Sequence, residues 1–234
     1  MFAPVRMSML GRAEKSGIID IDLVNIRDYS TDKHKKTDDV PFGGGNGMIM
    51  MPEPLTGALR SVGAEGKRVL YMSPRGKVMD EQMIRDFSEE EELVIVCGHY
   101  EGVDQRVIDA FSMEEVSIGD YIMTGGEIPA MALIDSVSRL LPGVLASEEA
   151  AYGESVYSGL LEYPQYTKPR EYERQSVPEV LVSGDHERIR LWNFEQSLRL
   201  TKERRPDLFD AYVRDEGPGL SKKERKILEE VITE

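Results

Sequence analysis

The chain has 234 residues, of which 40% are hydrophobic and 31% are charged, and its formal net charge is −14. This composition is typical of a soluble globular protein of one or two domains, and no apolar run approaches the 18 residues of a membrane span. The single cysteine, Cys97, excludes an intrachain disulfide, and the three scattered histidines do not form a zinc-binding pattern. We therefore expect a cytoplasmic protein with no metal ligands and no membrane attachment.

The first two-thirds of the chain alternates strand-like and helix-like segments. The apolar runs at residues 69–72 and 93–96 are short and bounded by turn residues, as buried parallel strands are. Between them, Asp80 can cap a helix, and residues 129–141 predict an amphipathic helix that ends before Pro142. This alternation predicts an α/β domain with a mostly parallel sheet.

The helical spacing of apolar residues fades after residue 146 and returns further along the chain. The pattern divides the chain into an α/β domain (1–146), a linker (147–163) and a small helical domain (164–234). Within the last region, Pro206 and the Gly-Pro-Gly run at 217–219 predict breaks between helices.

Three glycine-containing turns follow short strands, at residues 71–77, 97–106 and 117–127. In an open α/β sheet, ligands bind outside the carboxyl ends of the strands, and glycine lets the main chain approach a ligand closely. One such turn alone is more often only a tight turn, but three together predict a pocket built mainly from backbone. The glycine run at 43–47 has neither the ending of a P-loop nor the pattern of a dinucleotide-binding turn.

The negative net charge argues against nucleic-acid binding, because phosphate contacts need lysine and arginine. Two local clusters of basic residues soften that objection. One is the run at 33–36, and the other contains Arg188, Arg190, Arg199, Lys202, Arg204 and Arg205. Both clusters are either RNA contacts or ordinary solvated faces, and the sequence leaves these alternatives open.

Five long motifs identify a family. In chain order they read DDVPFGGGNGM, CGHYEGVDQR, SIGDYIMTGGE, GLLEYPQYTKP and VLVSGDH. Together they resemble the bacterial tRNA (guanine-37-N1)-methyltransferases of the SPOUT superfamily, from Gly11 to about Phe209. The resemblance implies an α/β fold with a deep trefoil knot between about residues 69 and 141, followed by a small C-terminal helical domain.

The resemblance also implies an activity and its partners. A methyl group would pass from S-adenosylmethionine to N1 of the guanine at tRNA position 37, with the active site formed by two subunits of a homodimer. A magnesium dependence is expected as well. The residues implied in cofactor binding are Tyr71, Met72, Ser73, Gly98, Glu101, Ile118, Gly119, Asp120, Tyr121, Ile122, Met123, Gly125 and Gly126. Glu101 would lie near the methionine end of the cofactor, where an acid suits an ammonium group.

Two residues are implied in catalysis. Arg139 corresponds to the family arginine that faces guanine O6; the alternative is a salt bridge to Asp135 one helical turn earlier. Glu154 stands where the family usually has an aspartate general base; the alternative is a solvated linker acid.

Departures from the family pattern keep other functions open. His99 and Gln105 stand where arginine and glutamate are usual. Family members also have a strand and a Leu-Phe-Pro-Glu turn ahead of the Met-Phe that opens this chain, so we expect one strand of the sheet to be missing or the start to be an internal methionine. The alternatives are a related SPOUT RNA methyltransferase with another target, or an inactive relic that binds RNA or S-adenosylmethionine.

Overall fold

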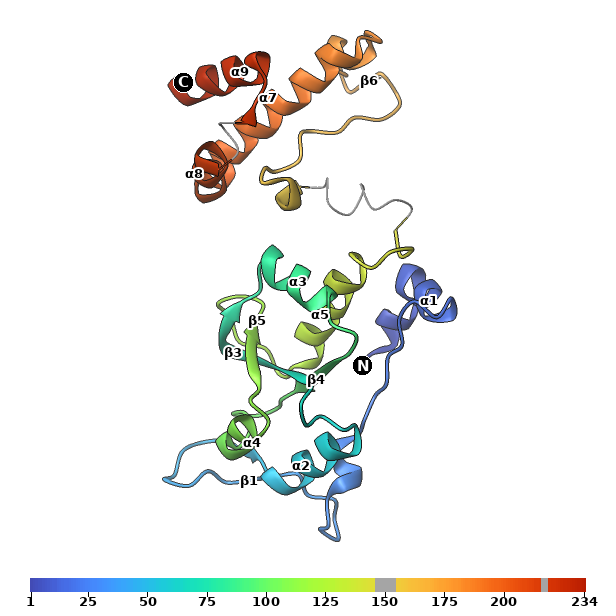
Figure 1. Cartoon of the computed structure of the whole chain (residues 1–234), viewed down its shortest axis with the longest axis vertical. Coiled ribbons are helices and arrows are strands. Elements are labelled where there is room, and N and C mark those ends of the chain that lie inside the picture. The colour runs from blue at the N-terminus through green and yellow to red at the C-terminus, as the bar shows by residue number, and fades with distance from the viewer. Residues whose placement is uncertain (146–154, 216–218) are drawn as a thin grey trace. The chain divides into compact units, whose positions relative to one another are not determined.

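The structure, a computed structural model, describes residues 1–145, 155–215 and 219–234. The chain separates into two compact units, Met1–Glu148 and Glu149–Glu234, which are described one at a time (Figure 1). None of the helices in these described ranges has the length and apolar character that crossing a membrane requires.

A three-stranded parallel sheet forms the centre of the first unit. Its strands are β3 (Arg68–Val78), β4 (Leu93–Cys97) and β5 (Glu114–Ser117), in the order β4-β3-β5. The first half of β3 is buried, as the central strand of a sheet covered on both faces must be. The predicted parallel strands at residues 69–72 and 93–96 are thereby confirmed.

Helices cover both faces of this sheet. Side chains alternate along β3, so Val69 and Tyr71 share a buried cluster with residues of α2 (Pro52–Ser61) and α4 (Gln105–Ala110). On the other side, α3 (Glu81–Ser88) packs against α5 (Glu127–Ser138), and α5 also contacts β4 (Figure 1). The unit is therefore an α/β layered structure.

Local sequence signals explain where two of these helices begin and end. The carboxylate of Asp80 accepts a hydrogen bond from the Met83 amide at 2.9 Å, so the predicted cap of α3 is confirmed. The predicted helix at 129–141 is present as α5, but it begins at Glu127 and ends at Ser138. Pro129 therefore occupies the first turn, where a missing amide hydrogen costs nothing.

The segment before the sheet consists of short elements. These are η1 (Ala3–Arg6), α1 (Ser8–Lys15), η2 (Ile26–Tyr29), and a hairpin of β1 (Asp38–Asp39) and β2 (Ile49–Met50). The η1 turn packs against α5, and η2 packs against α2. The hairpin loop at residues 40–48 projects outward from the unit, in light blue beside the β1 label of Figure 1.

The described part of the second unit is mainly helical. It contains η3 (Ser155–Ser158), the hairpin β6 (Glu171–Tyr172) and β7 (Gln175–Ser176), η4 (Glu179–Val182), α7 (His186–Arg204), α8 (Pro206–Asp215) and α9 (Lys222–Thr233). Leu198 of α7, Phe209 of α8 and Val231 of α9 meet in one buried cluster. The break predicted at Pro206 is confirmed as the boundary between α7 and α8.

Candidate active site

The carboxyl ends of the three parallel strands meet at one edge of the sheet. Met72 of β3 pairs with Cys97, the last residue of β4, and also with Val116 near the end of β5. The loops that follow β4 and β5 therefore start on either side of Met72, in the middle of β3. This is the edge at which open α/β sheets bind ligands.

The loop after β5 crosses this edge to reach the loop after β4. The amide of Gly126 donates a hydrogen bond to the carbonyl of Gly98 at 2.8 Å, and His99 forms an antiparallel bridge with Gly125. Two of the three predicted glycine-containing turns are thus joined directly through their backbones.

The glycines at this crossing are required by contacts inside the protein. A Cβ on Gly126 would lie 2.8 Å from the Cα of Cys97, and a Cβ on Gly98 would lie 2.8 Å from the ring of Tyr71. The sequence predicted that these glycines let the main chain approach a ligand. In the structure, both positions let one loop approach another part of the protein.

The third turn leaves the sheet as a bulge in β3. Both Met72 and Lys77 pair with Val116, so residues 73–76 are pushed out of the ladder. Tyr71, Met72 and Ser73 are buried beneath the edge. Burial, reinforced by the charge of nearby Glu115, raises the pKa of Tyr71, which therefore stays protonated at neutral pH.

The loop after β5 presents side chains to solvent at the same edge. Tyr121 is 56% exposed, Ile122 is 80% exposed and Asp120 is also exposed. The loop is shaped by Gly119, whose φ of +150° only glycine adopts readily and whose carbonyl accepts from the Tyr121 amide at 2.9 Å. An exposed aromatic ring, an aliphatic side chain and turn backbone together suit the planar edge and face of an adenine.

Glu101 is exposed on the loop after β4, so its carboxylate is accessible to a ligand. Its amide donates to the Met48 carbonyl at 3.0 Å, and its side chain lies directly against Gly47. The β1–β2 hairpin therefore borders the candidate cofactor loops. Sequence reasoning did not place these two segments together.

A polar pair links the two joined loops. The imidazole of His99 hydrogen-bonds the carboxylate of Glu127, the first residue of α5. Beneath it, burial and the Glu127 charge raise the pKa of the Cys97 thiol to about 12, so this thiol is protonated at neutral pH. No group of three or more His, Cys, Asp or Glu residues among those the structure describes is arranged to hold a metal ion.

Of the two predicted catalytic residues, the structure places one. Arg139 follows α5 directly and is half-buried, and its amide donates to the carbonyl of Asp135 at 3.2 Å. Because α5 begins at the loop crossing, this helix connects the candidate cofactor loops to Arg139. Glu154 lies outside the described residues.

Comparisons with known proteins identify the family. The sequence profile of the family described as tRNA (Guanine-1)-methyltransferase TrmD matches residues 1–211. The chain belongs to this methyltransferase family.

Similar proteins named tRNA (guanine-N(1)-)-methyltransferase span most of the chain. One from Ruminiclostridium cellulolyticum is 55% identical over 206 residues, covering 87% of this chain and 88% of the relative. One from Clostridium perfringens is 52% identical over 229 residues, covering 97% and 94%. One from Alkaliphilus oremlandii is 50% identical over 236 residues, covering 97% and 92%.

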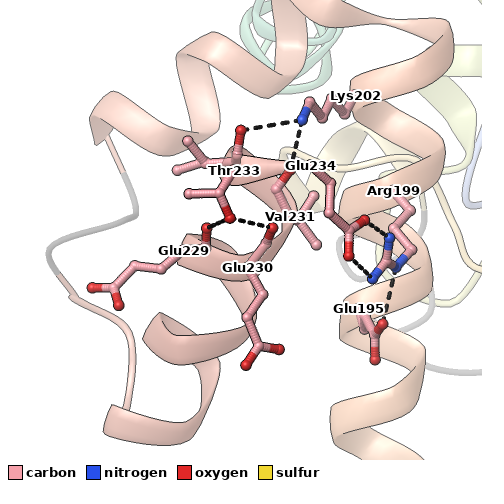
Figure 2. Close-up of polar contacts among 9 residues, drawn as sticks. Glu195, Arg199, Lys202, Glu229, Glu230, Val231, Thr233 and Glu234 are labelled. Atoms are coloured by element: carbon pink, nitrogen blue, oxygen red, sulfur yellow. Dashed lines mark hydrogen bonds and ion pairs between the residues drawn. The ribbon is translucent and has the colours of Figure 1, made fainter.

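For a member of the tRNA (guanine-1)-methyltransferase family, the basic residues of α7 are candidate phosphate contacts, but most of them are already engaged within their own unit. Arg199 bonds the carboxylates of Glu195 and Glu234, and Lys202 donates to the carbonyl of Val231 at 2.6 Å (Figure 2). The two carboxylates raise the pKa of Arg199 above its usual value, so the guanidinium is charged at any working pH.

Two further basic residues of this cluster are paired as well. Arg190 bonds Glu224 of α9, and Arg205 bonds Asp207 at 2.6 Å. Arg188 and Arg204 are both exposed, and neither forms an ion pair with another residue in the described parts of the chain. In this basic cluster, four residues are therefore bonded to carboxylates or carbonyls of their own unit, whereas Arg188 and Arg204 keep unneutralised charges.

Proposed function

We propose that this chain transfers the methyl group of S-adenosylmethionine to N1 of the guanine at position 37 of tRNA. Its family and its relatives make the chain a tRNA (guanine-N1)-methyltransferase. We propose three further points: the position of the guanine in tRNA, the residues that act on it, and the dimeric assembly that these residues need. The observation that carries it is the joining of the loops after β4 and β5, through Gly98 and Gly126, at the carboxyl edge of the sheet.

The residues at this edge fit the cofactor. The backbone of residues 118–123 would bind the adenine edge, with Tyr121 and Ile122 against its face, since both side chains are exposed there. The Glu101 carboxylate would pair with the ammonium group of the methionine part. Tyr71, Met72, Ser73 and Gly98 would form the floor, while Gly119, Asp120, Met123, Gly125 and Gly126 shape the surrounding loop. When bound, S-adenosylmethionine supplies an electrophilic methyl group on a sulfonium.

Arg139 and Glu154 would act on the guanine. As the bond between N1 and the methyl carbon forms and the carbon–sulfur bond breaks, the N1 proton would pass to the Glu154 carboxylate. The Arg139 guanidinium would stabilise the negative charge that develops on O6, which makes N1–H more acidic. The position of Arg139 at the end of α5, whose start is fixed by the loop crossing, supports this role.

The fold and assembly that we propose follow the same family. A trefoil knot would be threaded near the loop crossing, because residues 118–126 pass from the β5 edge to the β4 edge across the end of β3. Two chains would form a homodimer in which the linker of one subunit brings Glu154 to the loops of the other. Light scattering should then give twice the mass of one chain, and an active monomer would contradict this assembly.

The second unit would bind tRNA in the cytoplasm. This proposal is supported by Arg188 and Arg204 of α7, which are both exposed and have no ion-pair partner among the described residues, since phosphate contacts need free cations. The four paired cations of α7 and its end are assigned to stability of the unit instead.

The test is transfer of labelled methyl groups from S-adenosylmethionine to an unmodified tRNA transcript. We expect one methyl group per tRNA, recovered as 1-methylguanosine after digestion, and none when adenine replaces guanine at position 37. Methylation that persists in the substituted transcript would assign the enzyme another target. A chain that binds the cofactor and RNA without transfer would be an inactive relic.

A further inference from the structure

The loop at residues 40–48 carries a large apolar side chain that nothing in its own unit covers. Phe42 is fully exposed, and Val40 is 71% exposed. Three glycines with positive φ follow Phe42, and a Cβ at Gly43 or Gly44 would have open space around it. Only glycines follow Phe42 directly in the loop, and both faces of its ring are open to a partner.

The base of this loop is fixed to the candidate cofactor site. The Met50 amide donates to the Gly102 carbonyl at 2.9 Å, and the Asp104 amide donates to the Met50 carbonyl at 3.1 Å. Together with the bond from the Glu101 amide to Met48, these three backbone bonds join the hairpin to the loop after β4. The substrate base must approach this same loop, because it carries the proposed contact to the methyl donor.

The chemistry of the site favours a nucleic-acid base as the occupant. An enzyme that acts on a ring atom of a base must take that base out of its stack, which costs stacking energy at its neighbours. Proteins recover this energy by placing aromatic side chains against unpaired bases. One exposed ring offers the area of one base, whereas a stable contact with another protein buries roughly 1,000 Å² or more.

We infer that Phe42 stacks on an unpaired base beside the target guanine and so holds the anticodon loop while the guanine enters the site. This inference rests on the proposed function, because it takes tRNA as the substrate. It adds a substrate-positioning residue on the β1–β2 hairpin, separate from the residues proposed to bind the cofactor or move the proton.

Three substitutions in the full-length protein separate stacking from simple apolar contact. Phe42→Leu keeps an apolar side chain but removes the aromatic face, Phe42→Trp keeps a face, and Val40→Ala trims the other exposed apolar residue of the loop. Single-turnover methylation at limiting tRNA should fall about 5- to 150-fold in Phe42→Leu, the range expected for one stacked base. It should stay within about threefold of the wild type in Phe42→Trp and Val40→Ala, with S-adenosylmethionine affinity unchanged in all three.

A binding measurement tests the same interaction without turnover. Fluorescent 2-aminopurine is placed in turn on either side of the target guanine in the tRNA transcript. Stacking predicts quenching at one of the two positions on addition of the wild type, absent with Phe42→Leu and restored with Phe42→Trp. Quenching at neither position, or equal quenching by Phe42→Leu, would overturn the inference whether or not the enzyme is active.

The two proposals fail in different ways. A wild type that does not methylate guanine-containing transcripts would overturn the proposed function, whereas an active wild type matched by Phe42→Leu would overturn only the role of Phe42. A change of oligomeric mass in Phe42→Leu would mean that a second copy of the chain covers the ring, and this too would overturn the inference.

Discussion

His99 and Glu127 form a hydrogen bond that bridges the loop after β4 and the first turn of α5. The two residues are 28 positions apart in the chain, and both flank the contact between Gly98 and Gly126. The family usually has an arginine at position 99, and the histidine of this chain also supplies an N–H donor, which here bonds Glu127. The pair therefore stabilises the arrangement in which the two loops meet.

Removing this hydrogen bond should weaken cofactor binding slightly. Because the His99 side chain is 45% exposed, the bond contributes only about 0.5–1 kcal/mol, so His99→Ala should lower S-adenosylmethionine affinity about two- to fivefold in calorimetry. His99→Gln retains an N–H donor and serves as the matched control, with affinity closer to the wild type. Equal affinities in all three proteins would mean that the loops need no bridge.

The half-buried thiol of Cys97 predicts a loss of stability in alkaline solution. The pKa of Cys97 is raised from 9.0 to about 12, so between these values the folded state keeps a proton that the unfolded state has released. The free energy of unfolding should then fall with rising pH by up to about 1.4 kcal/mol per pH unit in this window. Urea unfolding can be measured at about pH 8 and about pH 10, on either side of the ordinary thiol pKa. Between these two pH values, the free energy of unfolding should decrease less in Cys97→Ala than in the wild type. Parallel decreases in the two proteins would contradict the burial of the thiol.

Substitution of the proposed base should affect chemistry and leave binding intact. Glu154→Gln removes the carboxylate but keeps its size, so single-turnover methylation should fall about 10²- to 10⁴-fold at unchanged S-adenosylmethionine affinity. Glu154→Asp restores the residue usual in the family and should retain substantial activity. Near wild-type turnover of the Gln variant would show that Glu154 is an ordinary linker acid.

The unneutralised cations of α7 should determine the salt dependence of tRNA binding. In Arg188→Gln and in Arg204→Gln, the slope of log affinity against log salt should become shallower by about one, because each substitution removes one cation from a phosphate. Arg199→Gln is the matched control on the same helix, because its charge is already paired with Glu195 and Glu234. A larger change of slope in Arg199→Gln than in Arg204→Gln would reverse this assignment.

The parts of the fold that depend on local signals could be predicted from the sequence. The runs at 69–72 and 93–96 are short and apolar enough to identify as strands, and Asp80 identifies the start of α3 because its side chain supplies the missing acceptor. The end of α5 was less predictable, since the apolar spacing continues through Leu140 after the helix stops at Ser138.

The contacts between distant segments could not be predicted in the same way. The basic stretch of α7 looks like an RNA-binding face in the sequence, but Glu224 and Glu234 neutralise part of it from another part of the chain. The attachment of the 40–48 loop to Glu101 depends on backbone hydrogen bonds, which leave no trace in side-chain patterns. Both features arise from tertiary packing, which residue spacing does not encode.

Two glycines, Gly98 and Gly126, permit the close approach of the two loops at the candidate active site. At Gly98 and Gly126 the main chains are close enough that one added methyl group at Gly126 would force the end of β4 away from the start of α5. That helix leads directly to Arg139. An alanine at position 126 would therefore tilt the helix and move the Arg139 guanidinium relative to the candidate cofactor loops. The direction in which this charged side chain points thus depends on the absence of a side chain at Gly126.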